Sequence, residues 1–254
     1  RLDFTNNSMQ RLAELLELAT GNAKPGARAW LSAALFGEVE PGMKVAAVGQ
    51  FNPGAVGGPN ASAGFEAESF VNPWDFVLVL EGALFFAATT TRRLEAAEPG
   101  MLAYPFTVRP AGVGNGGLGS SDESQARAEI WLPLWPAFAA AGEIKALLAE
   151  GRVTLGRRPV RDGLGFSRAV AALGVDRGIA AFQRYGFLMR SGKAYLAAPL
   201  TRVVVRRNPD ADLIEDLDAG YFLERLRQFA RKDETPARLR SLIRRLEDTL
   251  FELT

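Results

Sequence analysis

The 254-residue sequence contains no cysteine and no histidine, and these two absences narrow the chemistry open to the chain. Without cysteine there are no disulfides, so the sequence carries no redox evidence for a compartment. Zinc sites need histidine or cysteine, and Ser-His and Cys-His nucleophile systems need histidine. Carboxylate chemistry remains open, but the acidic residues form no metal-binding loop pattern. We therefore expect a chain that is not an enzyme and binds no metal or cofactor.

Long apolar runs are also missing. No signal-peptide pattern opens the sequence. The longest apolar run, residues 76–88, is interrupted by Glu81 and is shorter than the roughly 20 residues that span a bilayer. We expect this run to form a buried helix and the chain to have no membrane partner. A cytoplasmic location in a prokaryote is the default expectation.

Acidic residues are scarce in one part of the chain. Residues 151–207, called the basic block here, contain 12 basic residues (Lys and Arg) and 2 acidic residues (Asp and Glu). By contrast, residues 1–150 contain 10 basic and 16 acidic residues, and residues 208–254 contain 8 basic and 11 acidic residues. Eleven of the twelve are arginine, which suits bidentate phosphate contacts. We interpret the basic block as a surface that faces nucleic acid. The alternative is that it docks on the acidic first segment, which has too little surplus charge to neutralise it.

Caps and apolar spacing predict helices in the first segment. Residues 8–18 place leucines on one helical face behind Ser8 as the N-cap. Residues 27–36 predict a second, short helix that ends at Gly37.

A longer helix is predicted to start with Asn72 as its cap and Pro73 in its first position. It is apolar nearly all round, which suggests the central helix of this segment. Residues 104–108 are a possible strand, and residues 129–135 predict a buried crossing segment.

The basic block has a helix–helix–hairpin pattern. Residues 162–173 predict one helix, and Asp176 caps a second helix with Arg184 on its outer side. The runs FLMR and KAYLA follow, separated by Ser191-Gly192, a turn typical of β-hairpins. This pattern resembles a winged-helix unit, in which a helix enters a groove and the wing contacts the backbone. Many such units instead mediate protein contacts.

Residues 208–254 predict an antiparallel helix pair, with leucine-rich stripes on both sides of Thr235 and Pro236. The expected fold is therefore mainly α with small β elements (α+β). It has three parts: a helical core with Gly-rich loops over residues 1–150, a basic winged-helix-like unit over residues 151–207, and a helix-pair bundle over residues 208–254.

A Gly-rich stretch, QFNPGAVGGPNASAGF, covers residues 50–65 with four glycines, two prolines and no charge. Such a stretch suits neither a helix nor a central strand. Glycine lets the backbone approach a narrow groove, and Asn and Gln can hydrogen-bond to base edges there. The candidate base contacts are Gln50, Asn52 and Asn60, with Asn115 in a second Gly-rich stretch. The alternative is a structural loop whose amides satisfy buried backbone groups.

The candidate phosphate contacts are basic side chains of the basic block: Arg157, Arg158, Arg161, Arg184, Arg190, Lys193, Arg206 and Arg207. The alternative for each of them is a solvated surface charge, as most arginines and lysines are.

Four stretches of the chain, in this order, carry a family resemblance: GQFNPGAVGGPNASAGFEAESFVNPWDFVLVLEGALFFAA, YPFTVR, AEIWLPLW and EGRVTLGRRPVRDGLGFSRAVAALGVDRGIAAFQRYGFLMRSGKAYLAAPL. Together they resemble the large subunit of type I-G (formerly I-U) CRISPR effector (Cascade) complexes. The resemblance extends from about residue 30 to about residue 250. Members of that family are considerably longer, so the resemblance implies that this chain is a portion of such a subunit.

The resemblance implies a non-catalytic role in an RNA-guided antiviral defence complex. Such a subunit contacts guide RNA, target double-stranded DNA at a short flanking motif (the PAM), and the backbone and other subunits of the ribonucleoprotein complex. It also helps to recruit a separate helicase–nuclease. Base pairing reads the target sequence, while protein reads the flanking motif. The alternative is an assembly scaffold of the complex that does not read DNA.

Overall fold

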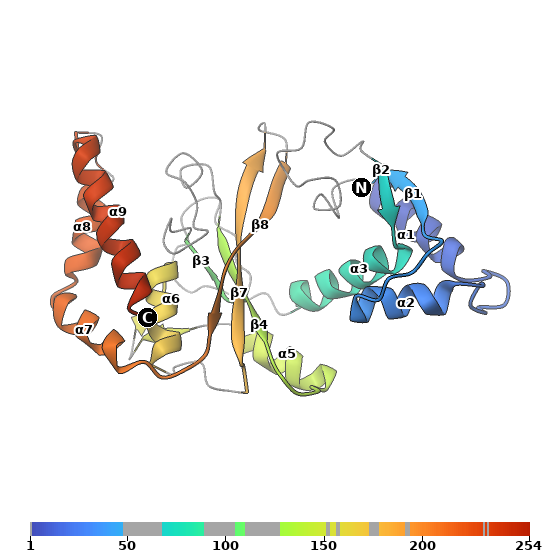
Figure 1. The fold of residues 1–254 in the computed structure, drawn as a ribbon, viewed down its shortest axis with the longest axis horizontal. Helices are drawn as coiled ribbons and strands as arrows, with labels where there is room; N and C mark the ends of the chain where they lie inside the picture. The colour runs from blue at the N-terminus through green and yellow to red at the C-terminus, as the bar shows by residue number, and fades with distance from the viewer. Residues whose placement is uncertain are drawn as a thin grey trace. The chain divides into compact units, whose positions relative to one another are not determined.

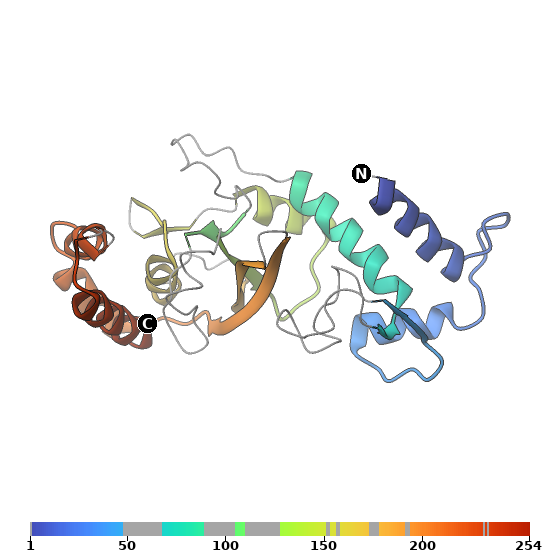
Figure 2. The same ribbon diagram turned by 90° about the horizontal axis from the view of Figure 1, so that it is seen from above.

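The computed structural model divides the chain into two compact units, Arg1–Ala88 and Thr89–Thr254 (Figures 1 and 2). Helices predominate and the strands form small sheets, which confirms the predicted α+β class. No helix in the described part of the chain has both the length and the apolar character needed to cross a membrane. The structure describes residues 2–47, 68–88, 105–109, 128–150, 153–155, 158–172, 178–190, 194–230, 232 and 234–254.

The first unit combines helices with a two-stranded antiparallel sheet. Its elements are α1 (Leu2–Leu15), α2 (Ala27–Phe36), β1 (Lys44–Ala47), β2 (Glu68–Val71) and α3 (Pro73–Ala88). The apolar helix α3 packs against both α1 and α2, as expected for the central helix of this unit. It is not buried all round, however, because Leu78, Val79 and Leu84 are exposed.

Local hydrogen bonds explain where α3 begins. The Asn72 side-chain oxygen accepts a hydrogen bond from the Trp74 backbone N–H at 3.1 Å, so the predicted cap is confirmed. The Asn72 side-chain amide donates to the Trp30 carbonyl at 2.6 Å, and the Trp74 indole N–H donates to the Ala27 carbonyl at 2.7 Å. These bonds attach the start of α3 to α2.

The boundaries of the two earlier helices give one success and one error. Helix α2 ends at Gly37, whose φ of 71° is the left-handed conformation that glycine tolerates, as predicted. Helix α1 begins at Leu2, so Ser8 lies inside the helix and the predicted cap is wrong. Residues 2–7 contain no glycine or proline, and nothing in them stops the helix from extending toward the N-terminus.

The second unit is built on a four-stranded antiparallel sheet in the order β3-β4-β7-β8. The strands are β3 (Thr107–Val108), β4 (Glu129–Leu134), β7 (Ala181–Arg190) and β8 (Ala194–Val204). Strand β4 pairs with β7 along its whole length. The predicted boundary at residue 150 therefore runs through one unit, since it separates two strands that share a sheet.

Helices and short elements complete this unit. They are α5 (Ala141–Glu150), β5 (Thr154–Leu155), β6 (Arg158–Pro159), α6 (Gly163–Ala171), the 3₁₀ turn η3 (Pro209–Asp212), α7 (Leu213–Leu217), α8 (Phe222–Ala230) and α9 (Ala237–Glu252). Helix α6 confirms the first predicted helix of the basic block, and Asp162 caps it by accepting from the Gly165 N–H at 2.8 Å. Helices α8 and α9 pack side by side, which confirms the predicted helix pair (Figure 1).

The predicted second helix of the basic block is wrong, because β7 occupies its place. The sequence from Ala181 alternates along a strand, so that Phe182, Arg184 and Gly186 are buried. Pairing with β4 on one side and β8 on the other stabilises this strand over the local helical preference. The predicted hairpin is confirmed in β7 and β8, whose last described pair is Arg190 with Ala194.

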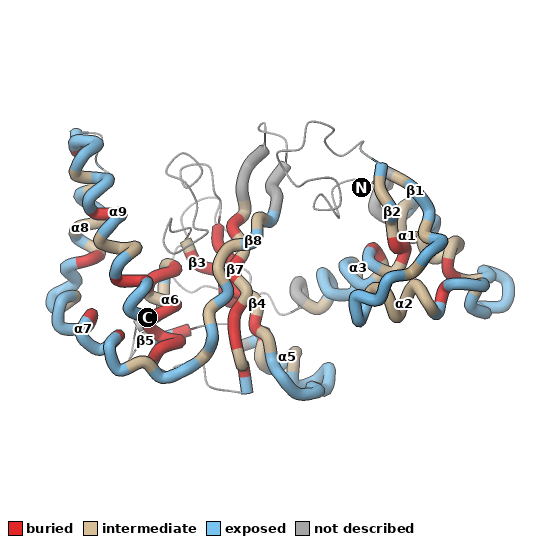
Figure 3. The backbone as a smooth tube through the Cα atoms, in the orientation of Figure 1, coloured by how far each residue is buried: buried red, intermediate tan, exposed pale blue. Residues whose placement is uncertain are grey.

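Aromatic side chains form the core of the second unit, and Figure 3 shows buried residues gathered along β4, β7 and α6. The rings of Trp131 and Phe166 stack with centroids 4.2 Å apart. Phe182 meets Phe166 edge-on at 5.1 Å, and Phe106 meets Phe182 at 5.7 Å. Each such pair contributes about 0.5–1.5 kcal/mol beyond its area burial. This cluster attaches α6 to one face of the sheet.

A buried ion pair lies beside the aromatic cluster. The Arg184 Nε donates to a Glu129 carboxylate oxygen at 2.6 Å, and both side chains are 0% exposed. The guanidinium carbon lies 5.1 Å from the Trp131 ring centre and 4.7 Å from that of Phe251 on α9. A Cβ atom at Gly163 would lie 3.2 Å from the Glu129 carboxylate, so the first residue of α6 leaves room for the pair.

Replacing Arg184 with alanine should lower the free energy of unfolding by about 3–5 kcal/mol, because it leaves the Glu129 carboxylate buried without its cation. The double replacement Glu129→Leu/Arg184→Met should cost less, since no charge remains buried. Chemical denaturation followed by circular dichroism measures both changes. Arg206→Ala, at an exposed site, is the control and should change stability by less than about 0.5 kcal/mol. An Arg184→Ala protein as stable as this control would contradict the assignment.

Candidate nucleic-acid interface

The β7–β8 hairpin continues past the rest of the sheet (Figure 1). The last pair between β4 and β7 joins Glu129 to Gly186, and the Phe187 N–H donates to the Ala128 carbonyl at 2.9 Å. Beyond this point, the described strands pair β7 with β8 only, as far as Arg190. Within the described residues, the end of the hairpin is therefore a two-stranded ribbon that extends beyond β4. A ribbon of this kind is one of the shapes that the DNA major groove admits.

The structure sorts the predicted phosphate contacts by their surroundings. Arg161, Arg206 and Arg207 are exposed, whereas Arg184 is buried. Arg158 and Arg190 lie on β6 and β7, where only their strand positions are described. Two predicted phosphate contacts and all four predicted base contacts lie outside the described residues: Arg157, Lys193, Gln50, Asn52, Asn60 and Asn115.

The predicted phosphate contact at Arg184 is wrong. It was expected on the outer side of a helix, but it lies on the core face of β7 with its charge neutralised by Glu129. Bringing it to a phosphate would require α9 to leave, since Phe251 covers its guanidinium. Arg184 is a structural residue.

Arg207 is exposed but engaged. Its guanidinium donates to an Asp212 carboxylate oxygen at 2.5 Å and to the Asn208 carbonyl at 2.9 Å. The hydrogen bond from Arg207 lowers the pKa of the Asp212 carboxyl below its ordinary value. The same bond raises the pKa of Arg207. A phosphate at Arg207 would compete with this carboxylate.

Sequence reasoning missed one exposed arginine, Arg202 on β8. The alternation of inward and outward side chains that would identify Arg202 requires β8 to extend to Val204. The predicted strand, the KAYLA run, ends before this arginine. Arg202, Val204 and Arg206 are all exposed and lie two residues apart. The described part of the chain offers Arg202 and Arg206 no carboxylate partner.

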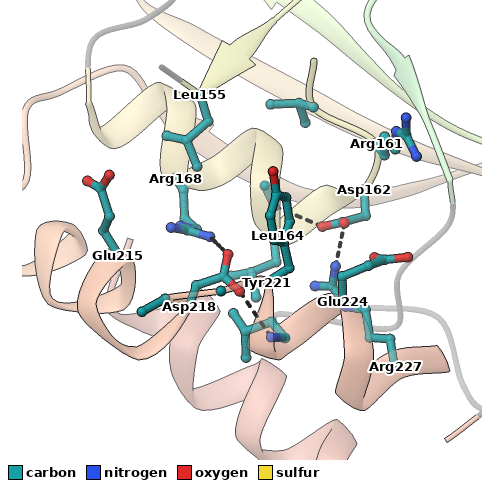
Figure 4. Close-up of a pocket in the computed structure, with 15 residues that line it drawn as sticks. Leu155, Arg161, Asp162, Leu164, Arg168, Glu215, Asp218, Tyr221, Glu224 and Arg227 are labelled. Atoms are coloured by element: carbon teal, nitrogen blue, oxygen red, sulfur yellow. Dashed lines mark hydrogen bonds and ion pairs between the residues drawn. The ribbon is translucent and has the colours of Figure 1, made fainter. Parts of the chain in front are cut away.

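A hollow of about 660 Å³ lies beside the start of α6 and the α7–α8 connection (Figure 4). Arg168 Nη1 contacts an Asp218 carboxylate oxygen at 3.0 Å, and Arg227 donates to both Asp162 and Glu247. Burial alone would lower the pKa of Arg227, but the two carboxylates outweigh it and raise the pKa. These pairs attach the C-terminal helices to α6.

The charges that line the hollow do not favour an anion. They comprise three arginines and four carboxylates: Arg161, Arg168, Arg227, Asp162, Glu215, Asp218 and Glu224. Arg168 and Arg227 are paired with carboxylates. Across the described ranges, no group of three or more acidic side chains is placed to hold a metal ion. We therefore place the candidate interface on the hairpin and not in the hollow.

Comparison with known protein families gives no match, and no curated protein sequence matches the chain. Function is therefore inferred from the geometry and the charges described above.

Replacing Arg207 with glutamine should raise the pKa of the Asp212 carboxyl toward its ordinary value. In the native chain the folded-state pKa lies below the unfolded one, so the stability from this pair is present above the unfolded pKa and is lost as the pH falls through the folded-state value. A ¹³C NMR titration of the carboxyl measures the shift. Arg206→Gln is the matched control and should leave the titration unchanged. Identical curves for the native chain and Arg207→Gln would contradict the pairing.

Proposed function

We propose that this chain is a non-catalytic, nucleic-acid-binding subunit of an RNA-guided CRISPR effector complex of the type I-G kind. In this role it contacts target double-stranded DNA at the flanking motif and steadies the guide and target strands. Its partners are the guide RNA, the other subunits of the complex and a helicase–nuclease that it helps to recruit.

The observation that carries the proposal is the β7–β8 ribbon, which extends beyond β4 and is formed by residues of the basic block. Arg190 and Lys193 flank Ser191-Gly192 in the sequence between the two strands. A two-stranded ribbon whose strands are joined by a segment with basic residues is suited to a nucleic-acid backbone, where arginine and lysine bind phosphate oxygens. The ribbon occupies the sequence position of the wing in the expected winged-helix-like unit. In the described part of the basic block, however, only one helix, α6, comes before it.

The charge of the basic block supports a polyanionic partner even after the ion pairs seen among the described residues are counted. Arg168, Arg184 and Arg207 pair with carboxylates that lie outside the block. Without these three, nine basic residues remain against two acidic ones. Of those two acids, Asp162 is itself paired with Arg227 from the last segment. Among the described residues, ion pairs with acidic segments of the same chain thus use three of the twelve basic residues.

Recognition of the flanking motif is assigned in this proposal to the Gly-rich stretch of residues 50–65, with Gln50, Asn52 and Asn60 as base contacts and Asn115 as a further one. The supporting reason is chemical, since Asn and Gln pair with base edges and glycine permits close backbone approach.

One observation favours a second candidate, an assembly scaffold without DNA reading. The first unit exposes large apolar side chains, including Phe36 at 75% and Phe70 at 65%. Where such side chains gather into a contiguous patch, they form a surface suited to contact another protein. Photo-crosslinking of the chain to duplex DNA separates the two candidates, because a pure scaffold gives no crosslink.

Binding to duplex DNA should be strongly salt-dependent, falling by ~10³ between 50 and 200 mM salt if about six phosphates are contacted. Arg190→Ala/Lys193→Ala should weaken binding to all duplexes similarly and reduce the salt slope by about 1 for each lost contact. Fluorescence anisotropy over a salt series measures both. Arg238→Ala/Arg245→Ala, two exposed arginines on α9, is the matched control with an unchanged slope. An affinity that barely changes with salt concentration would contradict the proposal.

Asn60→Ala should relax the preference among duplexes that differ in the flanking motif, whereas Arg157→Ala/Arg158→Ala should weaken all of them to a similar degree. The reason is that base-edge contacts distinguish sequences and phosphate contacts do not. Selection from a duplex library with a randomised flank, followed by sequencing, measures the preference. If both variants alter every sequence equally, the Gly-rich stretch has no reading role.

A further inference from the structure

The four-stranded sheet has two different faces along β7 and β8. One face holds Phe182 and Arg184, which are buried beneath α6 and α9. Residues that pair directly across two strands lie on the same face. The other face therefore collects three cross-strand pairs: Gln183 with Arg202, Tyr185 with Pro199, and Phe187 with Ala197. We call these six residues the outer face.

The outer face is accessible on its β8 side. Ala197, Pro199 and Arg202 are exposed, and Tyr185 and Phe187 beside them are half-buried. Accessibility is limited over β4, where Ile130, the cross-strand partner of Tyr185, is buried. The available surface is thus a strip along the hairpin with two aromatic rings and small neighbours.

The spacing of the two rings suits stacked bases. Tyr185 and Phe187 lie two residues apart on one strand, a separation of about 6.6–6.8 Å along the strand axis. An unpaired strand whose bases are splayed apart can place one base on each ring. Aromatic rings on an open sheet are a common platform for unpaired bases, because every base has a face that can stack.

The positively charged side chain of Arg202 lies at one end of this strip. Arg202 is exposed, and within the described ranges no carboxylate neutralises it. A guanidinium in that position can contact the phosphates of a strand whose bases stack on the two rings.

The edge of β8 is poorly suited to a protein strand, which is the main competing ligand. Pro199 lacks the N–H that an added strand would need. The pairing of β7 and β8 is shifted between Gln183 and Tyr185, and the Gln183 side chain donates to the Leu200 carbonyl at 2.9 Å there. A proline, a bulge and a charge are the usual devices that prevent strand addition at an edge.

We infer that the outer face binds single-stranded nucleic acid, with bases stacked on Tyr185 and Phe187 and a phosphate at Arg202. This inference rests on the proposed function and extends it, since it assigns the opened strand to the side of the hairpin and the duplex backbone to its tip. A duplex does not offer its base faces, so the outer face discriminates against it.

The test compares a fluorescent oligothymidylate with a duplex of equal length in anisotropy titrations of the whole chain. Phe187→Leu and Tyr185→Leu keep apolar cover but remove stacking, and each should weaken single-strand binding by about 5- to 150-fold. Phe187→Tyr should retain binding. Arg202→Ala should weaken it and reduce the salt slope by about 1. Duplex binding should be unchanged in all four variants.

Controls and outcomes keep this inference separate from the proposed function. Tyr221→Leu, an exposed tyrosine on the α7–α8 connection, should leave both affinities unchanged. Circular dichroism and thermal unfolding identify any variant that fails to fold, and the Phe187→Tyr protein then decides the point. Duplex binding without single-strand binding, or single-strand binding that survives Phe187→Leu, overturns this inference alone. No binding to either nucleic acid overturns the proposed function as well.

Discussion

The second unit depends on the buried contact between Glu129 and Arg184. A carboxylate and a guanidinium removed from water are tolerated only when they neutralise each other, and here each comes from a different strand of the sheet. The contact therefore fixes the pairing of β4 with β7 as well as the charge. Trp131 lies against the guanidinium in the sheet, Phe251 covers it from α9, and Gly163 lets α6 approach closely. Two helices and two strands thus meet at one point.

This arrangement determines which surfaces remain for ligands. Because α6 and α9 cover one side of the hairpin, the proposed nucleic-acid contacts are placed at its end and on its outer face. The arginines follow the same division. Arg168 and Arg184 are buried in ion pairs that hold elements together, whereas Arg202 and Arg206 face solvent. The proposed interface is consequently made of the charges that the fold does not use.

Local sequence signals predicted the elements that are fixed locally. The helix predicted from Asp162 is α6, α2 ends at Gly37 as predicted, and the two runs predicted as a hairpin are paired strands, because caps and hairpins need only neighbouring residues. Strand β7 was missed because its partner in β4 lies far away in sequence: the residue that neutralises Arg184 is 55 positions earlier. The same distance explains the error at the candidate site, where a basic residue in a basic block was assumed to be exposed. Burial depends on pairing, and composition does not reveal it.

The irregularity in β8 has a consequence for where charge is placed. Strand β8 uses two residues where β7 uses one, so that Arg202 pairs with Gln183 and Val203 pairs with Phe182. With uninterrupted pairing from Pro199 onward, the arginine would fall opposite Phe182, among the aromatic rings. The extra residue changes which side chains face each side of the sheet, so that Val203 lies on the inner face and Arg202 on the outer face. A deletion of one residue here would exchange the inner and outer sides of everything that follows in the strand.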